Sequence, residues 1–196
     1  MVSMVVPKYI PLGRWVLPGV FASLLAFASL TMAQAPSDLD GDGLPDGEVT
    51  CLVVANPGQT DADADGIGDA CDLTPTEAGD NGALTLTPTT LNLKSKGRAV
   101  TALVELPSGS DPADLDISTL RLEGVLPVLT PPAPKLGDAD ADGTPDFLAK
   151  FSRGALIGWL CATGRDHGTM PLRVTGFVEG QPFEVPGRVR VNGQCP

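Results

Sequence analysis

The sequence predicts a mainly β fold: an antiparallel β-sandwich of the immunoglobulin-like (Ig-like) type over residues 83–196, preceded by an irregular segment. That region contains short runs rich in β-branched residues and separated by proline and glycine, a pattern typical of sandwiches. Several runs alternate, as half-buried strands do; one face of the third carries Val100, Ala102, Val104 and Leu106. Only 154–160 favours a helical turn. The expected strands are 83–87, 90–93, 98–106, 117–125, 145–151, 171–179, 183–185 and 188–191.

The composition argues against two classes of partner and against catalysis. The 196 residues include 13 Lys and Arg, 24 Asp and Glu and one His, which give a net charge of −11. Without a basic cluster, we expect no nucleic-acid binding and no attraction to anionic membranes. The lone imidazole, His167, follows Asp166 in a glycine-flanked stretch that indicates a surface turn. Most serine, cysteine and zinc enzymes need a placed imidazole, so we expect a protein that is not an enzyme.

The first 33 residues have the layout of a secretory signal peptide. Lys8 and Arg14 precede an apolar run over 15–30, and no acidic residue stands before Asp38. Small residues favour cleavage after Ala33, and a retained membrane anchor is the alternative. We expect a secreted, extracellular or cell-surface protein, with the periplasm as an alternative, and no membrane span after signal removal. The chain without its first 33 residues has 11 basic and 24 acidic side chains, a net charge of −13.

The four cysteines fit an oxidising compartment, in which cysteines form disulfides. Three pairings are open, and we favour the local one, Cys51 with Cys71 and Cys161 with Cys195. Closing loops of this size stabilises a fold by roughly 3–4 kcal/mol on the chain-entropy account.

The acidic residues concentrate in three twelve-residue windows, 38–49, 61–72 and 138–149, which hold 14 of the 24. Each window places aspartate at positions 1, 3, 5 and 9 and glycine at position 6. Carboxylates this close repel one another unless a cation lies between them. Oxygen ligands in an irregular loop favour Ca²⁺ over Mg²⁺, which demands a strict octahedron. The predicted side-chain ligands are Asp38, Asp40, Asp42 and Asp46, then Asp61, Asp63, Asp65 and Asp69, then Asp138, Asp140, Asp142 and Asp146.

Positions 7 and 12 complete the predicted calcium loops. The glycine at position 6 permits a sharp turn that brings the backbone carbonyl of position 7 onto the ion. Position 12 is a carboxylate in the middle loop, Asp72, whereas the first and third loops have Val49 and Ala149 there. We therefore expect the middle site to bind most strongly. The predicted carbonyl ligands belong to Leu44, Ile67 and Thr144.

The first two loops and the stretch between them resemble thrombospondin type 3 repeats. The stretch contains Cys51 and an Asn-Pro-x-Gln turn over 56–59, and the second loop ends in the sequence Gly-Asp-Ala-Cys-Asp over 68–72. The match covers 38–72, and the departure from the family pattern is Val49, where the family usually has Asp.

The resemblance implies a segment, 34–72, that has little hydrophobic core and wraps around bound Ca²⁺. It also implies that the aspartates of the first two loops and Asp72 are ligands, and that Cys51 is bonded to Cys71. Independently, 38–72 contains no Lys, Arg or aromatic residue. A segment of this composition cannot bury enough surface to offset its chain entropy, so we expect its order to depend on ions.

The rest of the chain divides into a linker and a β domain. Residues 73–82 have the composition of a linker, and the third calcium loop, 138–149, lies inside the domain over 83–196. The runs 91–97 and 137–151 resemble a β domain of secreted and surface proteins of bacteria.

Together these features predict a calcium-binding, structural or adhesive protein whose ions stiffen a spacer that presents the β domain. Extracellular protein or polysaccharide is the expected partner besides calcium. An extracellular ligand- or polysaccharide-binding accessory module is the second class, and a hydrolase is the third.

Overall fold

The computed structural model describes residues 37–129, 135–138 and 144–195, which belong to one compact unit. The predicted signal peptide, 1–33, lies outside the described residues. Within the described ranges, no helix is both long and apolar enough to cross a membrane.

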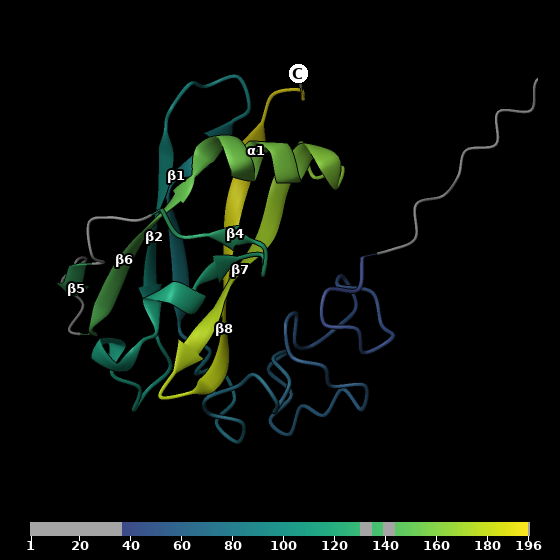
Figure 1. The fold of residues 1–196 in the computed structure, drawn as a ribbon, viewed down its shortest axis with the longest axis vertical. Helices are drawn as coiled ribbons and strands as arrows, with labels where there is room; N and C mark the ends of the chain where they lie inside the picture. Colours follow the sequence, from purple (N-terminus) through teal and green to yellow (C-terminus); the bar gives the residue numbers. More distant parts are fainter. Residues whose placement is uncertain (1–36, 130–134, 139–143, 196) are drawn as a thin grey trace, which may run out of the picture. The chain divides into compact units, whose positions relative to one another are not determined.

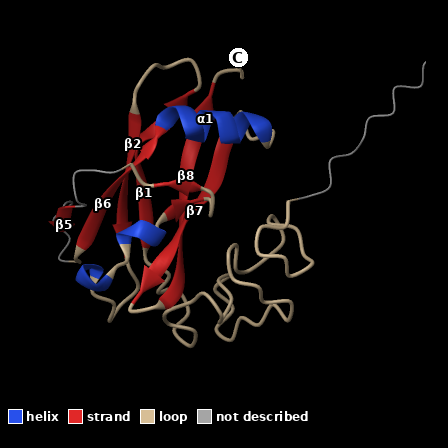
Figure 2. Cartoon of the chain, viewed as in Figure 1, coloured by secondary structure: helices blue, strands red, loops and turns tan. Residues whose placement is uncertain are grey.

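The described residues form one eight-stranded sheet with the strand order β4-β3-β7-β8-β1-β2-β6-β5 (Figures 1 and 2). The strands are β1 (Ala83–Asn92), β2 (Ala99–Glu105), β3 (Arg121–Leu122), β4 (Leu126–Pro127), β5 (Lys135–Gly137), β6 (Asp146–Ser152), β7 (Gly168–Val178) and β8 (Gln181–Asn192). Two short 3₁₀ helices, η1 (Pro112–Asp114) and η2 (Ile117–Thr119), and one α-helix, α1 (Arg153–Ala162), accompany them.

The sheet is mixed, because β1 and β8 pair in parallel while the other neighbouring strands are antiparallel. A bridge between Val128, just after β4, and Phe151 of β6 brings the two margins of the sheet together, so the sheet nearly closes into a barrel. The predicted β class is confirmed. In place of two antiparallel sheets, the described residues form one mixed sheet that curves onto itself.

The long strands β1 and β8 contain proline, and β8 also contains glycine, residues that interrupt most strands. The expected strands 83–87 and 90–93 are both parts of β1, and 183–185 and 188–191 are both parts of β8. The β1–β8 ladder shifts register between Thr85 and Thr90. The irregular stretch of β1 therefore has no regular partner on β8, and a proline is tolerated there.

The core lies on the predicted alternating face. Val100, Ala102, Val104 and Leu106 are all buried, as are Leu172 and Val174 of β7. Leu156 and Leu160 of α1 pack into the same cluster. The expected helical turn is therefore a full helix, and the Ser152 hydroxyl caps it by accepting the Ala155 N–H at 3.2 Å. Phe177 of β7 is 39% exposed.

Both favoured disulfides are present. Cys51 is bonded to Cys71, and Cys161 of α1 is bonded to Cys195 beyond β8. The first bond, with Ile67 and Val54, forms a small separate core in a part of the chain that has no helix or strand between 37 and 82.

Candidate metal centre

The first two aspartate loops, 38–49 and 61–72, fold in nearly the same way over their first nine positions. In both, the position-3 carboxylate accepts the N–H of position 5, and the position-5 carboxylate accepts the N–H of position 7. These Asx-type turns keep the loop tight without helix or strand. The position-1 carboxylate accepts the N–H of position 6, and the position-9 carboxylate accepts the N–H of position 2. The repeat seen in the sequence is therefore also a repeat of hydrogen bonds.

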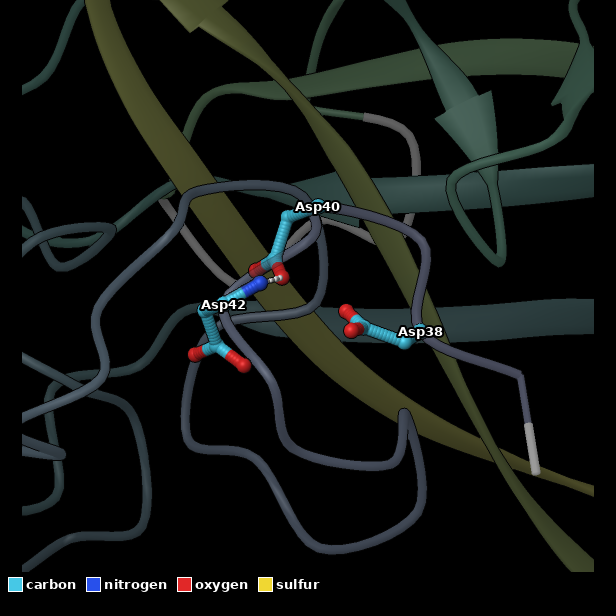
Figure 3. Close-up of side chains that lie close together, drawn as sticks. All are labelled: Asp38, Asp40 and Asp42. Atoms are coloured by element: carbon cyan, nitrogen blue, oxygen red, sulfur yellow. Dashed lines mark hydrogen bonds between the residues drawn. The ribbon is translucent and has the colours of Figure 1, made fainter. Parts of the chain in front are cut away.

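Figure 3 shows three carboxylates of the first loop, those of Asp38, Asp40 and Asp42, and the hydrogen bond from the Asp42 N–H to Asp40. The position-9 bond, from the Leu39 N–H to Asp46 Oδ1, measures 2.7 Å. Asp38 Oδ2 accepts the Gly43 N–H at 3.2 Å, Asp40 Oδ1 accepts the Asp42 N–H at 3.1 Å, and Asp42 Oδ1 accepts the Leu44 N–H at 2.8 Å.

The second loop repeats these contacts closely. The position-9 bond, from the Ala62 N–H to Asp69 Oδ1, measures 2.8 Å. Asp61 Oδ2 accepts the Gly66 N–H at 3.0 Å, Asp63 Oδ1 accepts the Asp65 N–H at 3.3 Å, and Asp65 Oδ1 accepts the Ile67 N–H at 2.8 Å.

The glycine at position 6 has the backbone conformation that the sequence requires. Gly43 has φ 93° and Gly66 has φ 97°, values that residues other than glycine rarely adopt. This turn brings together three carboxylates in each loop: one oxygen from each of positions 1, 3 and 5 lies within 4.8 Å of the others.

Several carboxylate oxygens in these loops are buried and accept no hydrogen bond from the described residues. They are Asp40 Oδ2, Asp63 Oδ2, Asp65 Oδ2 and Asp72 Oδ2. A buried anionic oxygen without a donor is costly, and a cation is the partner that satisfies several such oxygens at once. Three of the four belong to the second loop.

Asp72 lies at position 12 of the second loop, near Asp63 and Asp65. One oxygen accepts the Thr74 N–H at 2.8 Å, which leaves Oδ2 without a donor. Burial raises the pKa of this carboxyl, and the nearby charges of Asp65 and Asp63 raise the pKa further. The carboxylate of position 12 is thus close enough to those of positions 3 and 5 to be repelled by them.

In the first loop, protein groups satisfy more of the carboxylate oxygens. Asp42 Oδ2 accepts the Gln59 Nε2 amide at 3.3 Å and the Asn56 N–H at 3.4 Å. Burial raises the pKa of Asp40, and the charges of Asp42 and Asp38 add to the shift. The loop therefore keeps one buried oxygen without a donor, at Asp40, against three in the second loop.

The Asn-Pro-x-Gln turn connects the two loops. Gln59 Oε1 accepts the Thr50 N–H at 2.6 Å, and its amide donates to the Asn56 side-chain oxygen at 2.7 Å. Beyond the turn, the Asp69 N–H donates to the Thr60 carbonyl at 3.0 Å. The Gln59 side chain thus holds the turn to Asp42 of the first loop and to the Thr50 backbone.

Val49, at position 12 of the first loop, has a structural role. Its side chain is buried, and its carbonyl accepts two bonds from the Arg173 guanidinium of β7, each of 3.3 Å. The position that carries a carboxylate in the second loop, Asp72, therefore carries a residue that contacts the sheet in the first.

The third loop connects the two strands of a hairpin. β5 and β6 pair antiparallel, with Gly137 opposite Asp146. Asp138 is exposed, Thr144 is half-buried and Asp146 is fully buried at the start of β6. Asp140 and Asp142 lie outside the described residues, and Ala149 is buried within β6 opposite Ala102 of β2.

The histidine lies on the surface, in the turn between α1 and β7. His167 is exposed, and its Nδ1 lies 2.7 Å from Asp166 Oδ1. Arg165 beside it stacks over Trp159 at 4.9 Å and pairs with Glu123 at 3.1 Å.

Comparison with known proteins finds no counterpart: no model of a protein family matches this chain, and neither a curated protein nor a solved structure does.

Proposed function

We propose that residues 37–72 form a calcium-binding module built on the two aspartate loops. The observation that carries the proposal is the set of buried carboxylate oxygens without donors at Asp63, Asp65 and Asp72. Their mutual repulsion is relieved by a cation of high charge between them. Hydrogen bonds to the other oxygen of each group fix the carboxylates in place, so the site is prepared for an ion.

The donor set favours calcium among the common ions. All candidate ligands are oxygens, the lone histidine lies elsewhere, and all four cysteines are in disulfides. Calcium accepts six to eight oxygens in loose geometry, whereas zinc and copper prefer nitrogen and sulfur. In the second loop, the proposed ligands are Asp61, Asp63, Asp65, the Ile67 carbonyl, Asp69 and Asp72.

The first and third loops are proposed as further sites. The first would use Asp38, Asp40, Asp42, the Leu44 carbonyl and Asp46, and the third Asp138, Asp140, Asp142, the Thr144 carbonyl and Asp146. Because Asp42 already accepts two protein donors, the first loop should bind more weakly than the second.

We infer a structural role for these ions. The module has a small apolar cluster around one disulfide, so bound ions contribute much of the energy that orders it. With the predicted signal peptide, this supports an exported structural or adhesion-type protein of the thrombospondin type 3 kind.

Calorimetric titration of Ca²⁺ into the oxidised, metal-free protein tests the proposal. We expect dissociation constants of about 10⁻⁴–10⁻³ M, as in extracellular modules. The double variant Asp63→Asn and Asp65→Asn should remove the tighter site. Asp111→Asn, at the cap of η1, is the control and should bind like the original protein. Absence of binding at about 10 mM Ca²⁺, well above that range, would overturn the proposal.

A further inference from the structure

The calcium module is fastened to the sheet by a buried glutamate. Glu184 of β8 is 2% exposed. Its Oε1 accepts the Leu52 N–H, and its own N–H donates to the Cys71 carbonyl at 3.1 Å. One residue of the sheet therefore holds the backbone of the module on both sides of the Cys51–Cys71 disulfide.

Arg173, on the neighbouring strand β7, completes this attachment. Its guanidinium lies 3.1 Å from Glu184 Oε2 and also donates to the Val49 carbonyl. Its backbone N–H donates to Glu123 Oε1 at 2.7 Å. Two buried carboxylates, Glu123 and Glu184, thus surround one arginine that contacts the module.

A second contact lies at the turn between β3 and β4. Gly124 has φ 65°, and a Cβ placed on it would lie 2.5 Å from a methyl carbon of Leu39 and 2.7 Å from one of Val53. Apolar side chains of the module therefore pack against a position that only glycine can occupy. This contact is independent of the charged one.

Two of the residues that attach the module are sequence neighbours of proposed ligands. Leu39 lies between Asp38 and Asp40, and Cys71 precedes Asp72. A change in the shape of either loop therefore moves an attachment point, and release of an attachment point loosens a loop.

We propose that residues 37–72 form a calcium-controlled cover on the β7–β8 face, attached when the loops hold calcium and released when they lose it. The inference rests on the calcium-binding function proposed above. Without the ion, the carboxylates repel one another and the loops lose their shape, so Leu52, Val49 and Leu39 no longer meet their partners. Release uncovers Arg173 and Glu184.

The charged contact suits a reversible attachment. A buried ion pair gains little net free energy, because desolvation of both groups offsets their attraction. When the module leaves, Arg173 and Glu184 regain water, so the uncovered sheet is not left with an unpaired buried charge. Calcium occupancy can therefore decide whether the cover is attached.

Hydrogen exchange of backbone amides in the full oxidised chain tests the proposal. The diagnostic amides are those of Leu52 and Glu184, which donate across the contact. With Ca²⁺ both should be protected, and with chelator both should exchange at least about tenfold faster. Amides of the β2–β6 ladder, such as that of Val104, should change little and report that the sheet stays folded.

Gly124→Leu separates attachment from ion binding, since it blocks the contact and changes no proposed ligand. We expect the same number of bound ions with an affinity lowered about tenfold, within the usual range of coupling between sites. Gly109→Leu is the matched control, because Gly109 also has a positive φ of 83° but open space around it. Glu184→Gln is a second, milder variant, which keeps an acceptor for Leu52 and removes the ion pair.

The outcomes distinguish the two proposals. If calorimetry shows calcium binding but the Leu52 and Glu184 amides exchange equally with and without the ion, the cover is wrong and the calcium function stands. Wild-type calcium affinity in both Gly124→Leu and Glu184→Gln would also overturn the coupling. If no calcium binds, both proposals fail.

Discussion

Ala64 in the second aspartate loop has the left-handed conformation that Gly41 has at the same position of the first, with φ 63° against 78°. Both residues occupy position 4 of their loops. A residue with a Cβ is disfavoured there by roughly 1–2 kcal/mol, whereas glycine is not. The second loop therefore carries backbone strain that the first avoids.

Replacing Ala64 with glycine should stabilise the calcium-loaded protein. We expect a gain of about 0.5–1 kcal/mol, since part of the relieved strain is offset by the greater freedom of glycine in the unfolded chain. Urea unfolding at saturating calcium measures it. The reciprocal change, Gly41→Ala, should destabilise by a similar amount. A loss of stability in Ala64→Gly would contradict this account of the loop.

The parallel pairing of β1 with β8 depends on a glycine. A Cβ on Gly187 would lie 2.5 Å from the Leu84 carbonyl oxygen and 2.7 Å from two of its side-chain carbons. We expect Gly187→Ala to cost about 1–3 kcal/mol, because β1 must move away from β8. Gly158→Ala in α1 is the control: nothing lies near its Cβ position, and alanine favours helix by about 1 kcal/mol. Equal stability of the two variants would contradict the prediction.

The sequence predicts those features of the fold that are determined by residues close together in the chain. Alternation placed Val100 and Val104 correctly on the buried face, because a strand's period is a property of its own residues. The parallel β1–β8 pairing joins residues about a hundred positions apart and leaves no local mark. Pro186 and Gly187 also indicate a strand end, although β8 continues across them because it pairs with its neighbouring strands.

The candidate site shows the same division. The aspartate spacing predicted three calcium loops, and in the two that the structure describes in full the triplets converge and the position-6 glycines are left-handed, since Asx turns are made within a few residues. The sequence gives no sign that Val49, Leu52 and Cys71 contact Arg173 and Glu184, because those partners are more than a hundred residues away. A buried Glu184 within a strand was the available signal: a carboxylate at a position expected to be covered requires a partner.

The Cys51–Cys71 disulfide should matter for calcium affinity as well as stability. It closes a loop with a sequence separation of 20, which on the chain-entropy account contributes about 3 kcal/mol. Replacing both cysteines with alanine should weaken calcium binding, because the ion must then order a freer chain. Calorimetry checks it, with the Cys161–Cys195 pair replaced as the control. Unchanged affinity in the first variant would show that the loops order independently of the bond.

The pH dependence of stability should differ with and without calcium. When residues 37–72 are attached to the sheet and no ion is bound, burial raises the pKa of Glu123, Glu184, Asp40 and Asp72. A carboxyl whose folded pKa lies above its unfolded value keeps a proton that unfolding releases. Such a carboxyl therefore lowers the free energy of unfolding at high pH. This loss is absent below the unfolded pKa, which is 3.8 for Asp and 4.5 for Glu, and it grows as the pH rises through the folded pKa.

Calcium-depleted protein should consequently become more stable as the pH falls from neutral towards 4.5, the unfolded pKa of Glu, because protonation lowers the penalty on the form with residues 37–72 attached. Calcium-loaded protein should show a smaller gain or a loss, because protons then compete with the ion at Asp40 and Asp72. Urea unfolding over this pH range, with calcium removed by a chelating resin or held in excess, measures both slopes. Glu184→Gln should flatten the slope of the depleted protein. A depleted protein that loses stability on mild acidification would show that these buried carboxyls keep their ordinary pKa, and the burial argument for the attachment at Glu184 would weaken with it.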